Sequence, residues 1–164
     1  MAARFERAAA HVLTCLIPLA DLTCAGHDDP EPSMQTHPVR LSPGDDLRVA
    51  VEGLLSQYAS KAAFVIQGIG SLSVAQLRFA GAGSPAELHG DLEILTLAGS
   101  VSPDGAHLHM SVSDAQGRVF GGHVARGCTV RTTVELLLVL LPDHRFSRSL
   151  DPLTGYAELQ IHNA

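Results

Sequence analysis

Lysine and large aromatic residues are scarce in this sequence. Lys61 is the only lysine, tryptophan is absent, and Phe and Tyr together number seven among 164 residues. With 11 basic against 17 acidic side chains, the formal net charge is −6. A protein that coats nucleic acid through its own charge needs clustered Lys and Arg, so the composition argues against that class. The 46% hydrophobic content and 17% charged content are instead typical of one folded domain with an aliphatic core.

The three cysteines, Cys15, Cys24 and Cys128, are widely spaced, and no Cys-x-x-Cys pair occurs. The sequence therefore excludes a zinc ribbon and a thioredoxin-like redox motif. An odd, scattered set also argues against a disulfide framework and favours a reducing compartment. We predict a cytoplasmic location on this basis.

The first 37 residues differ from the rest. An apolar run over residues 8–20 follows two arginines, as in a secretory signal, but it is too short to span a bilayer. Residues 26–38 form a polar, Pro-rich linker. Three interpretations remain open: a signal peptide, which would export the protein if residues 1–25 act as one, a disordered extension, or translation from upstream of a start at Met34. We predict that residues 1–37 are an N-terminal extension.

Residues 38–162 carry the pattern of a folded domain. Ser42-Pro43-Gly44-Asp45 resembles a capping box, and apolar residues recur at helical spacing behind it, which predicts a helix over residues 43–59. A turn is predicted at Gly68-Ile69-Gly70-Ser71. Apolar or alternating runs predict strands at residues 62–69, 72–79, 88–100, 107–113, 119–124, 130–141 and 156–161. The run of leucines within residues 130–141 is also compatible with a helix, so both alternatives remain for this segment. The expected fold class is α/β of an α+β-like kind: a compact single domain with a central, mainly antiparallel sheet and one main packed helix.

Histidines supply the candidate metal ligands. His107 and His109 lie two residues apart in a predicted strand and therefore share a face. His123 follows two glycines on the next strand, and His89 is a further candidate nearby. Neutral imidazoles suit zinc and related metals, and three of them leave a coordination position open. The alternative is that these histidines are polar side chains on a solvated sheet face.

The length of the hairpin loop before His123 decides whether it can join the other two. With a four-residue loop at 114–117, His123 falls opposite Leu108 and faces away from His109. A five-residue loop, or a bulge at Gly121-Gly122, brings His123 opposite His109 on the shared face. The metal hypothesis therefore predicts one of these two irregularities.

Two glutamates, Glu93 and Glu135, stand within apolar runs. A lone buried carboxylate is costly, so each is expected either to pair with an arginine or to face a ligand. The candidate arginines are Arg78, Arg126 and Arg131.

Several motifs, in chain order, resemble the PPC domain (plants and prokaryotes conserved, also called DUF296). They are Leu41–Leu47, Gly68–Leu72 with Arg78, Gly90–Ile94, the His-x-His and Gly-Gly-His motifs, Thr133–Glu135 and Asp151–Leu159. The resemblance covers residues 38–162 and implies a compact α/β domain that assembles as a homotrimer. It also implies metal binding, as in some prokaryotic members, at the positions matching His107, His109 and His123. Plant members generally lack these histidines and follow AT-hook motifs. The chain contains no Gly-Arg-Pro core of an AT-hook, so it resembles the stand-alone prokaryotic type.

We therefore expect a trimeric PPC-domain protein that binds a divalent metal, with zinc as the first candidate, and that has a regulatory or protein-interaction role. The alternative is a metal-dependent enzyme that uses the three-histidine site, with Glu93 as its candidate base. Association with DNA is a third hypothesis, but the acidic chain and the missing AT-hook argue against direct contact. Such contact would have to gather Arg40, Arg48, Arg118, Arg126, Arg131, Arg145 and Arg148 on one face. Beyond the candidate base Glu93 the catalytic residues are unknown, and the sequence indicates no small-molecule ligand and no membrane span.

Overall fold

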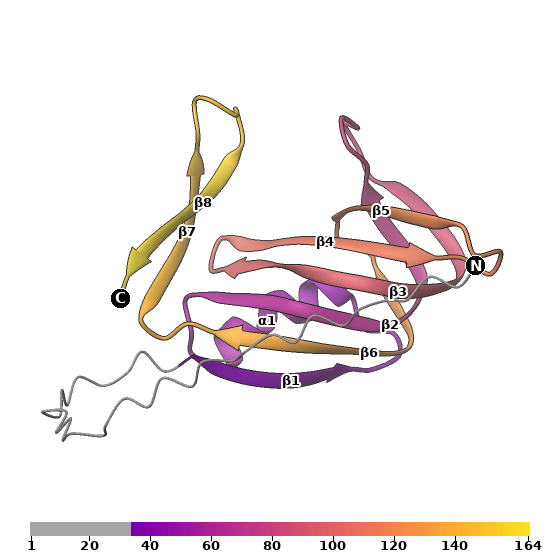
Figure 1. Ribbon diagram of the computed structural model, residues 1–164, viewed down its shortest axis with the longest axis horizontal. Coiled ribbons are helices and arrows are strands. Elements are labelled where there is room, and N and C mark those ends of the chain that lie inside the picture. Colours follow the sequence, from indigo (N-terminus) through magenta and orange to yellow (C-terminus); the bar gives the residue numbers. More distant parts are fainter. Residues whose placement is uncertain (1–33) are drawn as a thin grey trace, which may run out of the picture.

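The computed structural model describes residues 34–164, which form one helix and eight strands (Figure 1). The predictions for residues 1–33 lie outside the described residues. In chain order the elements are β1 (Gln35–Leu41), α1 (Leu47–Gln57), β2 (Ala63–Arg78), β3 (Ala86–Ser102), β4 (Gly105–Ser113), β5 (Val119–Val124), β6 (Thr129–Leu140), β7 (His144–Leu150) and β8 (Ala157–Asn163). All strand pairs are antiparallel, and the single helix packs on the main sheet. The predicted fold class is confirmed.

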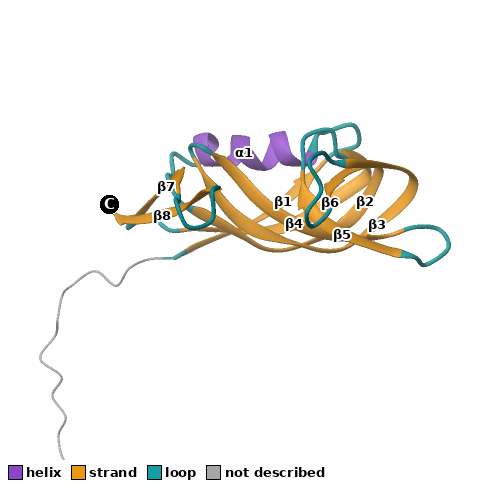
Figure 2. Cartoon of the chain, turned by 90° about the horizontal axis from the view of Figure 1, so that it is seen from above, coloured by secondary structure: helices purple, strands orange, loops and turns teal. Residues whose placement is uncertain are grey.

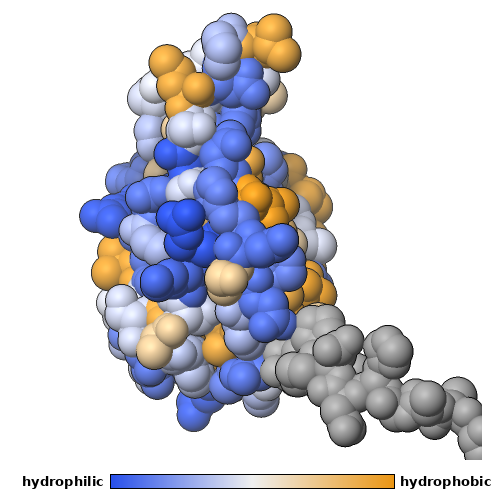
Figure 3. All heavy atoms as spheres, turned by 90° about the vertical axis from the view of Figure 1, so that its left-hand side faces the viewer, coloured by the Kyte–Doolittle hydropathy of each residue, from blue (hydrophilic) through white to orange (hydrophobic). Residues whose placement is uncertain are grey.

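The main sheet has the strand order β1-β6-β2-β3-β4-β5, and β5 also pairs with the end of β2. This second pairing means that the β2 to β5 half of the sheet curls back on itself. Helix α1 covers one face of the sheet (Figure 2). Strands β7 and β8 form a separate hairpin that projects from the sheet (Figures 1 and 3). The hairpin is anchored by Phe146, which is buried and packs edge-on against Phe64 of β2.

Helix α1 begins four residues later than the capping-box pattern predicts. Asp46, not Ser42, is the N-cap, and its carboxylate accepts a hydrogen bond from the backbone N–H of Val49. Ser42 instead belongs to a preceding turn, where its backbone N–H donates to the carboxylate of Asp45 over 2.8 Å. The side chains that the helix buries against the sheet are Leu47, Val51, Leu54 and Leu55.

The turn predicted at residues 68–71 is wrong, because β2 runs through it without a break. Gly70 has a positive φ of 141°, and a side chain there would collide with the backbone of Thr133 on β6. These glycines therefore permit close strand contact instead of a chain reversal. Strands β1 and β7 were not predicted from the sequence. The run at residues 130–141 is the strand β6, so the helix left open there does not form.

Cys128 is a free, buried thiol. Burial raises its pKa to about 11, so it is unreactive at neutral pH. Among the described helices, α1 is too short and too polar to cross a membrane.

Candidate metal centre

His107, His109 and His123 come together on one face of the sheet. His107 and His109 point to the same side of β4, and His123 of β5 lies directly opposite His109 across the β4–β5 pair. One ring nitrogen from each of the three residues lies within 4.8 Å of the other two. The Nε2 atoms of His107 and His109 are 3.1 Å apart. Two imidazole nitrogens bound to one tetrahedral zinc ion lie about 3.3 Å apart, so this pair has the spacing of two ligands.

The register that assembles the cluster comes from a five-residue loop, residues 114–118, because Ser113 pairs with Val119. The carboxylate of Asp114 accepts hydrogen bonds of 2.9 Å from the backbone N–H groups of Gln116 and Arg118. These bonds keep Arg118 in the loop and out of the strand. Of the two irregularities that the metal hypothesis allowed, the longer loop is the one that forms.

The two glycines before His123 pair regularly with β4 and form no bulge. Gly122 instead allows β5 to approach the end of β2, since an added Cβ would lie 2.7 Å from the backbone oxygen of Arg78. At Gly121 the nearest atom to an added Cβ, the oxygen of Met110, would be 3.5 Å away, which is ordinary contact. Gly122 thus has a structural reason to be glycine, and Gly121 has none of this kind.

The environment of the cluster favours the neutral imidazole at His107 and His123. Burial is the largest of the effects that lower the pKa of His123 to about 4, and the neighbouring His107 and Arg48 contribute to the same shift. Burial and the nearby Arg148 also lower the pKa of His107. A neutral imidazole has a free lone pair, which is the form that binds a metal.

Two arginines contact the cluster directly. Nη1 of Arg48 lies 3.3 Å from Nε2 of His123, and Nη1 of Arg148 lies 3.4 Å from Nδ1 of His107. A guanidinium only donates, so each of these contacts uses the lone pair of that ring nitrogen. In a neutral His107 the proton then lies on Nε2, and it must leave that atom before Nε2 can bind a metal. The other nitrogen of His123, Nδ1, is buried and has no hydrogen-bond partner among the described residues.

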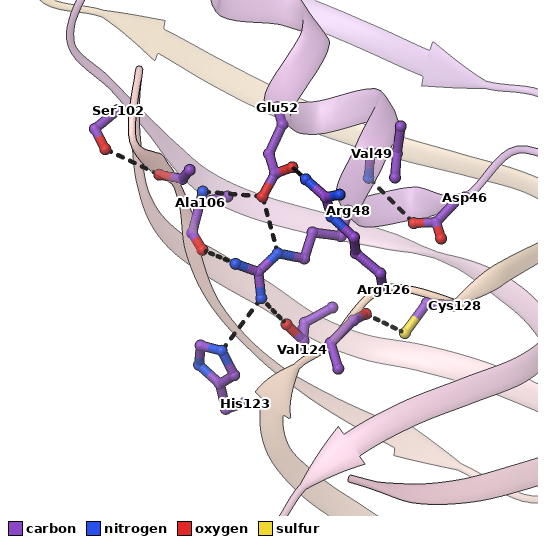
Figure 4. A network of polar contacts seen from close by, with 12 residues as sticks. Asp46, Arg48, Val49, Glu52, Ser102, Ala106, His123, Val124, Arg126 and Cys128 are labelled. Carbon is purple, nitrogen blue, oxygen red and sulfur yellow. Dashed lines mark hydrogen bonds and ion pairs between the residues drawn. The ribbon is translucent and has the colours of Figure 1, made fainter. Parts of the chain in front are cut away.

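Arg48 is held in place by a network that extends across the helix and two strands (Figure 4). It donates to the backbone oxygens of Ala106 and Val124, both over 2.7 Å, and its Nε pairs with Glu52 over 2.9 Å. Burial raises the pKa of Glu52, but hydrogen bonds from Arg48, the Ala106 N–H and Arg126 outweigh it and lower the pKa overall. Glu52 is therefore an ionised anchor for Arg48.

The histidines line a cleft of about 450 Å³. Its other polar walls are Arg48, Arg78, Arg148, Tyr156 and Glu158, and Ala106 and Ala157 complete it. The arginines and Glu158 were not predicted as site residues. They come from α1, from the end of β2 and from the β7–β8 hairpin, and no sequence spacing connects them to the histidine motifs.

The other candidate residues lie elsewhere. His89 is exposed on β3 and contacts Glu87. Glu93 pairs with Ser113, four residues along β4 from His109, and it does not line the cleft. Glu93 and Glu135 are both exposed, and neither forms an ion pair within residues 34–164, so the expected pairing with an arginine does not occur. The alternative, that each faces a ligand, stays a prediction.

Several of the arginines considered for DNA contact are paired with carboxylates. Four of the seven form ion pairs: Arg48 and Arg126 with Glu52, Arg118 with Asp114, and Arg131 with Asp91. A surface of paired arginines is a poor source of free positive charge for phosphates.

Comparisons with known proteins agree on one family. The Plants and Prokaryotes Conserved (PCC) domain matches residues 29–142. Two bifunctional GlmU proteins from Synechococcus strains are each 48% identical, over 80% and 84% of this chain. The chain spans only about a fifth of the length of these relatives, 21% and 22%.

Three solved structures share the fold. A hypothetical protein from Salmonella enterica is 36% identical with a TM-score of 0.77, and the match covers 82% of this chain and 97% of that one. A protein from Archaeoglobus fulgidus, described as metal-containing, is 25% identical with a TM-score of 0.67, over 77% and 93%. A proposed DNA-binding protein from Ralstonia eutropha is 27% identical with a TM-score of 0.64, over 75% and 89%.

Proposed function

This chain belongs to the Plants and Prokaryotes Conserved domain family, and from that premise we propose that it is a homotrimeric protein that binds one divalent metal ion per chain. His107, His109 and His123 would hold the ion. We further propose that the protein acts in the cytoplasm, in a regulatory or protein-interaction role and not as a direct reader of DNA.

The observation that carries the metal proposal is the cluster of three imidazoles with one ring nitrogen each within 4.8 Å of the other two. All-nitrogen donor sets suit zinc and its first-row neighbours better than magnesium or calcium, which prefer oxygen. Three protein ligands leave a position open, and a metal bound there would supply a Lewis acid. The metal-containing relative from Archaeoglobus supports the same interpretation.

Zinc titration of the metal-stripped full chain tests the site. We expect one zinc ion per chain in the wild type and loss of tight binding in His109→Ala, because this variant removes one of the three ligands. His89→Ala is the matched control, since His89 is an exposed histidine outside the cluster. Equal zinc affinity in His109→Ala and the wild type, or no zinc bound by the wild type, would contradict the proposal.

The proposal of a homotrimer is based on the face of the sheet that α1 does not cover (Figure 2). This face exposes Ile69 and Leu137, which lie on the paired strands β2 and β6 and whose exposed fractions are 51% and 38%. A groove of about 480 Å³ runs beside Val39, Ile69 and Leu137. Contiguous apolar surface of this kind marks association sites. A second and third copy of the chain are the occupants that the family resemblance implies.

Light scattering on the purified chain tests the assembly. We expect a mass three times the 17.3 kDa of one chain and dissociation on Ile69→Glu. Val49→Glu is the control, because Val49 is 49% exposed on the helix and not on the open sheet face. A wild-type monomer, or an unchanged assembly in Ile69→Glu, would rule out this interface.

A gel-shift assay tests the proposal that the protein does not contact DNA directly. The acidic charge of −6 and the paired arginines predict no shift of duplex DNA at physiological salt. A gel shift that weakens steeply as salt rises would reverse this conclusion, because phosphate contacts release counterions.

A further inference from the structure

A row of three side chains crosses neighbouring strands on the face that carries the histidines. Arg78, at the end of β2, pairs with His123 of β5, and His123 pairs with His109 of β4. Side chains directly opposite each other in an antiparallel pair have Cβ atoms about 4.5–5.5 Å apart and point to the same face. Arg78 therefore starts beside the histidine cluster, and it lines the same cleft.

Two further arginines enter the cleft from other elements. Arg48 comes from α1 and contacts His123, and Arg148 comes from β7 and contacts His107. Glu158 is the single carboxylate among the lining residues. Three arginines and one carboxylate give the lining more positive than negative charge, although the whole chain carries −6.

Two of these arginines lack a countercharge. Arg48 is neutralised by Glu52, whereas Arg78 and Arg148 form no ion pair with any residue from 34 to 164. The guanidinium of Arg148 donates only to neutral acceptors, among them Ser100 Oγ over 2.8 Å and the backbone oxygen of Ala157 over 3.3 Å. These bonds fix its guanidinium while leaving its charge uncompensated.

The side chain of Arg78 is half-buried, and it makes no hydrogen bond within the described part of the chain. Its donors are therefore free to bind a ligand. A partly desolvated cation without a partner is unfavourable, and a bound anion would relieve that cost.

We propose that this cleft binds a small oxyanion, a phosphate or carboxylate group, through Arg78 and Arg148 beside the histidine cluster. The planar guanidinium fork matches the oxygens of both groups and binds them with charge-assisted hydrogen bonds. The volume of about 450 Å³ lies within the range of small-molecule sites, about 300–1,000 Å³. The site goes beyond metal binding and does not require it.

Isothermal titration of the metal-stripped full chain with inorganic phosphate, and separately with succinate, tests this site. We expect the wild type to bind at least one of the two probes, and the tighter one identifies the preferred group. Arg78→Gln is expected to weaken that binding about tenfold or more, the typical cost of one charge-assisted hydrogen bond. Arg78 has no hydrogen bonds to lose within the described residues, so this variant is expected to fold normally.

Arg148→Gln is expected to weaken binding to a similar extent. Arg145→Gln is the matched control, because Arg145 is exposed on the same strand, outside the cleft, and removes the same charge. Unchanged affinity for the probe in Arg145→Gln would support a specific site formed by Arg78 and Arg148. No binding of either probe by the wild type, or equal weakening in Arg145→Gln and Arg78→Gln, overturns the proposal. If the protein binds an oxyanion but no zinc, the oxyanion proposal is supported and only the metal proposal is contradicted.

Discussion

Replacing Arg48 with methionine is expected to destabilise the protein far more than the same replacement at Arg126, although both arginines pair with Glu52. The Arg48 side chain is 20% exposed, and the Arg126 side chain is 70% exposed. Methionine keeps most of the apolar stem, so each variant removes mainly the guanidinium and its hydrogen bonds.

The magnitude follows from what each guanidinium leaves behind. Arg48→Met removes the ion pair with Glu52 and the donors to two backbone oxygens, those of Ala106 and Val124. Removing one partner of a buried pair costs about 3–5 kcal/mol. Glu52 keeps its bonds from Arg126 and from the Ala106 N–H, so we expect about 2–4 kcal/mol for Arg48→Met. Arg126→Met loses one exposed pair and should cost at most about 1 kcal/mol.

Urea unfolding of the metal-stripped proteins at pH 7 measures both values. Because the folded-state pKa of Glu52 lies below its ordinary value, its contribution is present above the unfolded pKa and is lost as pH falls through the folded one. The difference between wild type and Arg48→Met should therefore shrink in acid. Equal losses in the two variants, or a loss below about 1 kcal/mol in Arg48→Met, would refute the reasoning that the buried contacts dominate.

Three further predictions concern the cluster and the hairpin. In the metal-stripped protein, the His123 imidazole should titrate near pH 4 by NMR; because this pKa is depressed, stability should fall as pH drops from the unfolded-state value towards it, and titration near 6.5 would disprove this. Gly122→Ala should cost about 1–3 kcal/mol by urea unfolding, because its Cβ would lie 2.7 Å from a β2 backbone oxygen, whereas Gly121→Ala should be tolerated at 3.5 Å; equal effects would contradict the close approach. Phe146→Ala should cost about 3–5 kcal/mol because Phe146 is buried, and Leu150→Ala, at 73% exposed on the same strand, should cost little; a small loss for Phe146→Ala would show that the hairpin does not depend on this anchor.

The histidine cluster was predictable because strand periodicity is a local property. His107 and His109 share a face in any strand, and the structure confirms β4 at the predicted residues. The face on which His123 lies could not be predicted, because the sequence of the turn does not determine at which residue the next strand begins. The two hydrogen bonds that Asp114 accepts decide it, and they depend on the folded loop.

The elements that the sequence missed are those whose stability comes from docking. β1 contains Pro38 and polar residues, which an edge strand tolerates because one side of it needs no ladder bonds. β7 buries only Phe146, too little apolar pattern to reveal a strand. Glu93 and Glu135 looked buried because their neighbours are apolar on both sheet faces, and the open face bears exposed Ile and Leu beside them.

The presence of arginines in the cleft could not be predicted from the sequence for a different reason. Arg78 meets His123 only because the sheet curls until β5 pairs with the end of β2, and that contact depends on the missing side chain of Gly122. Arg148 arrives on a hairpin that docks from outside the sheet. His123 consequently lies between the other histidines and the free guanidinium of Arg78. A metal ion at the cluster and an oxyanion at Arg78 would attract each other at this short range, so occupation of either position should strengthen the other, and by reciprocity the coupling must be equal in both directions.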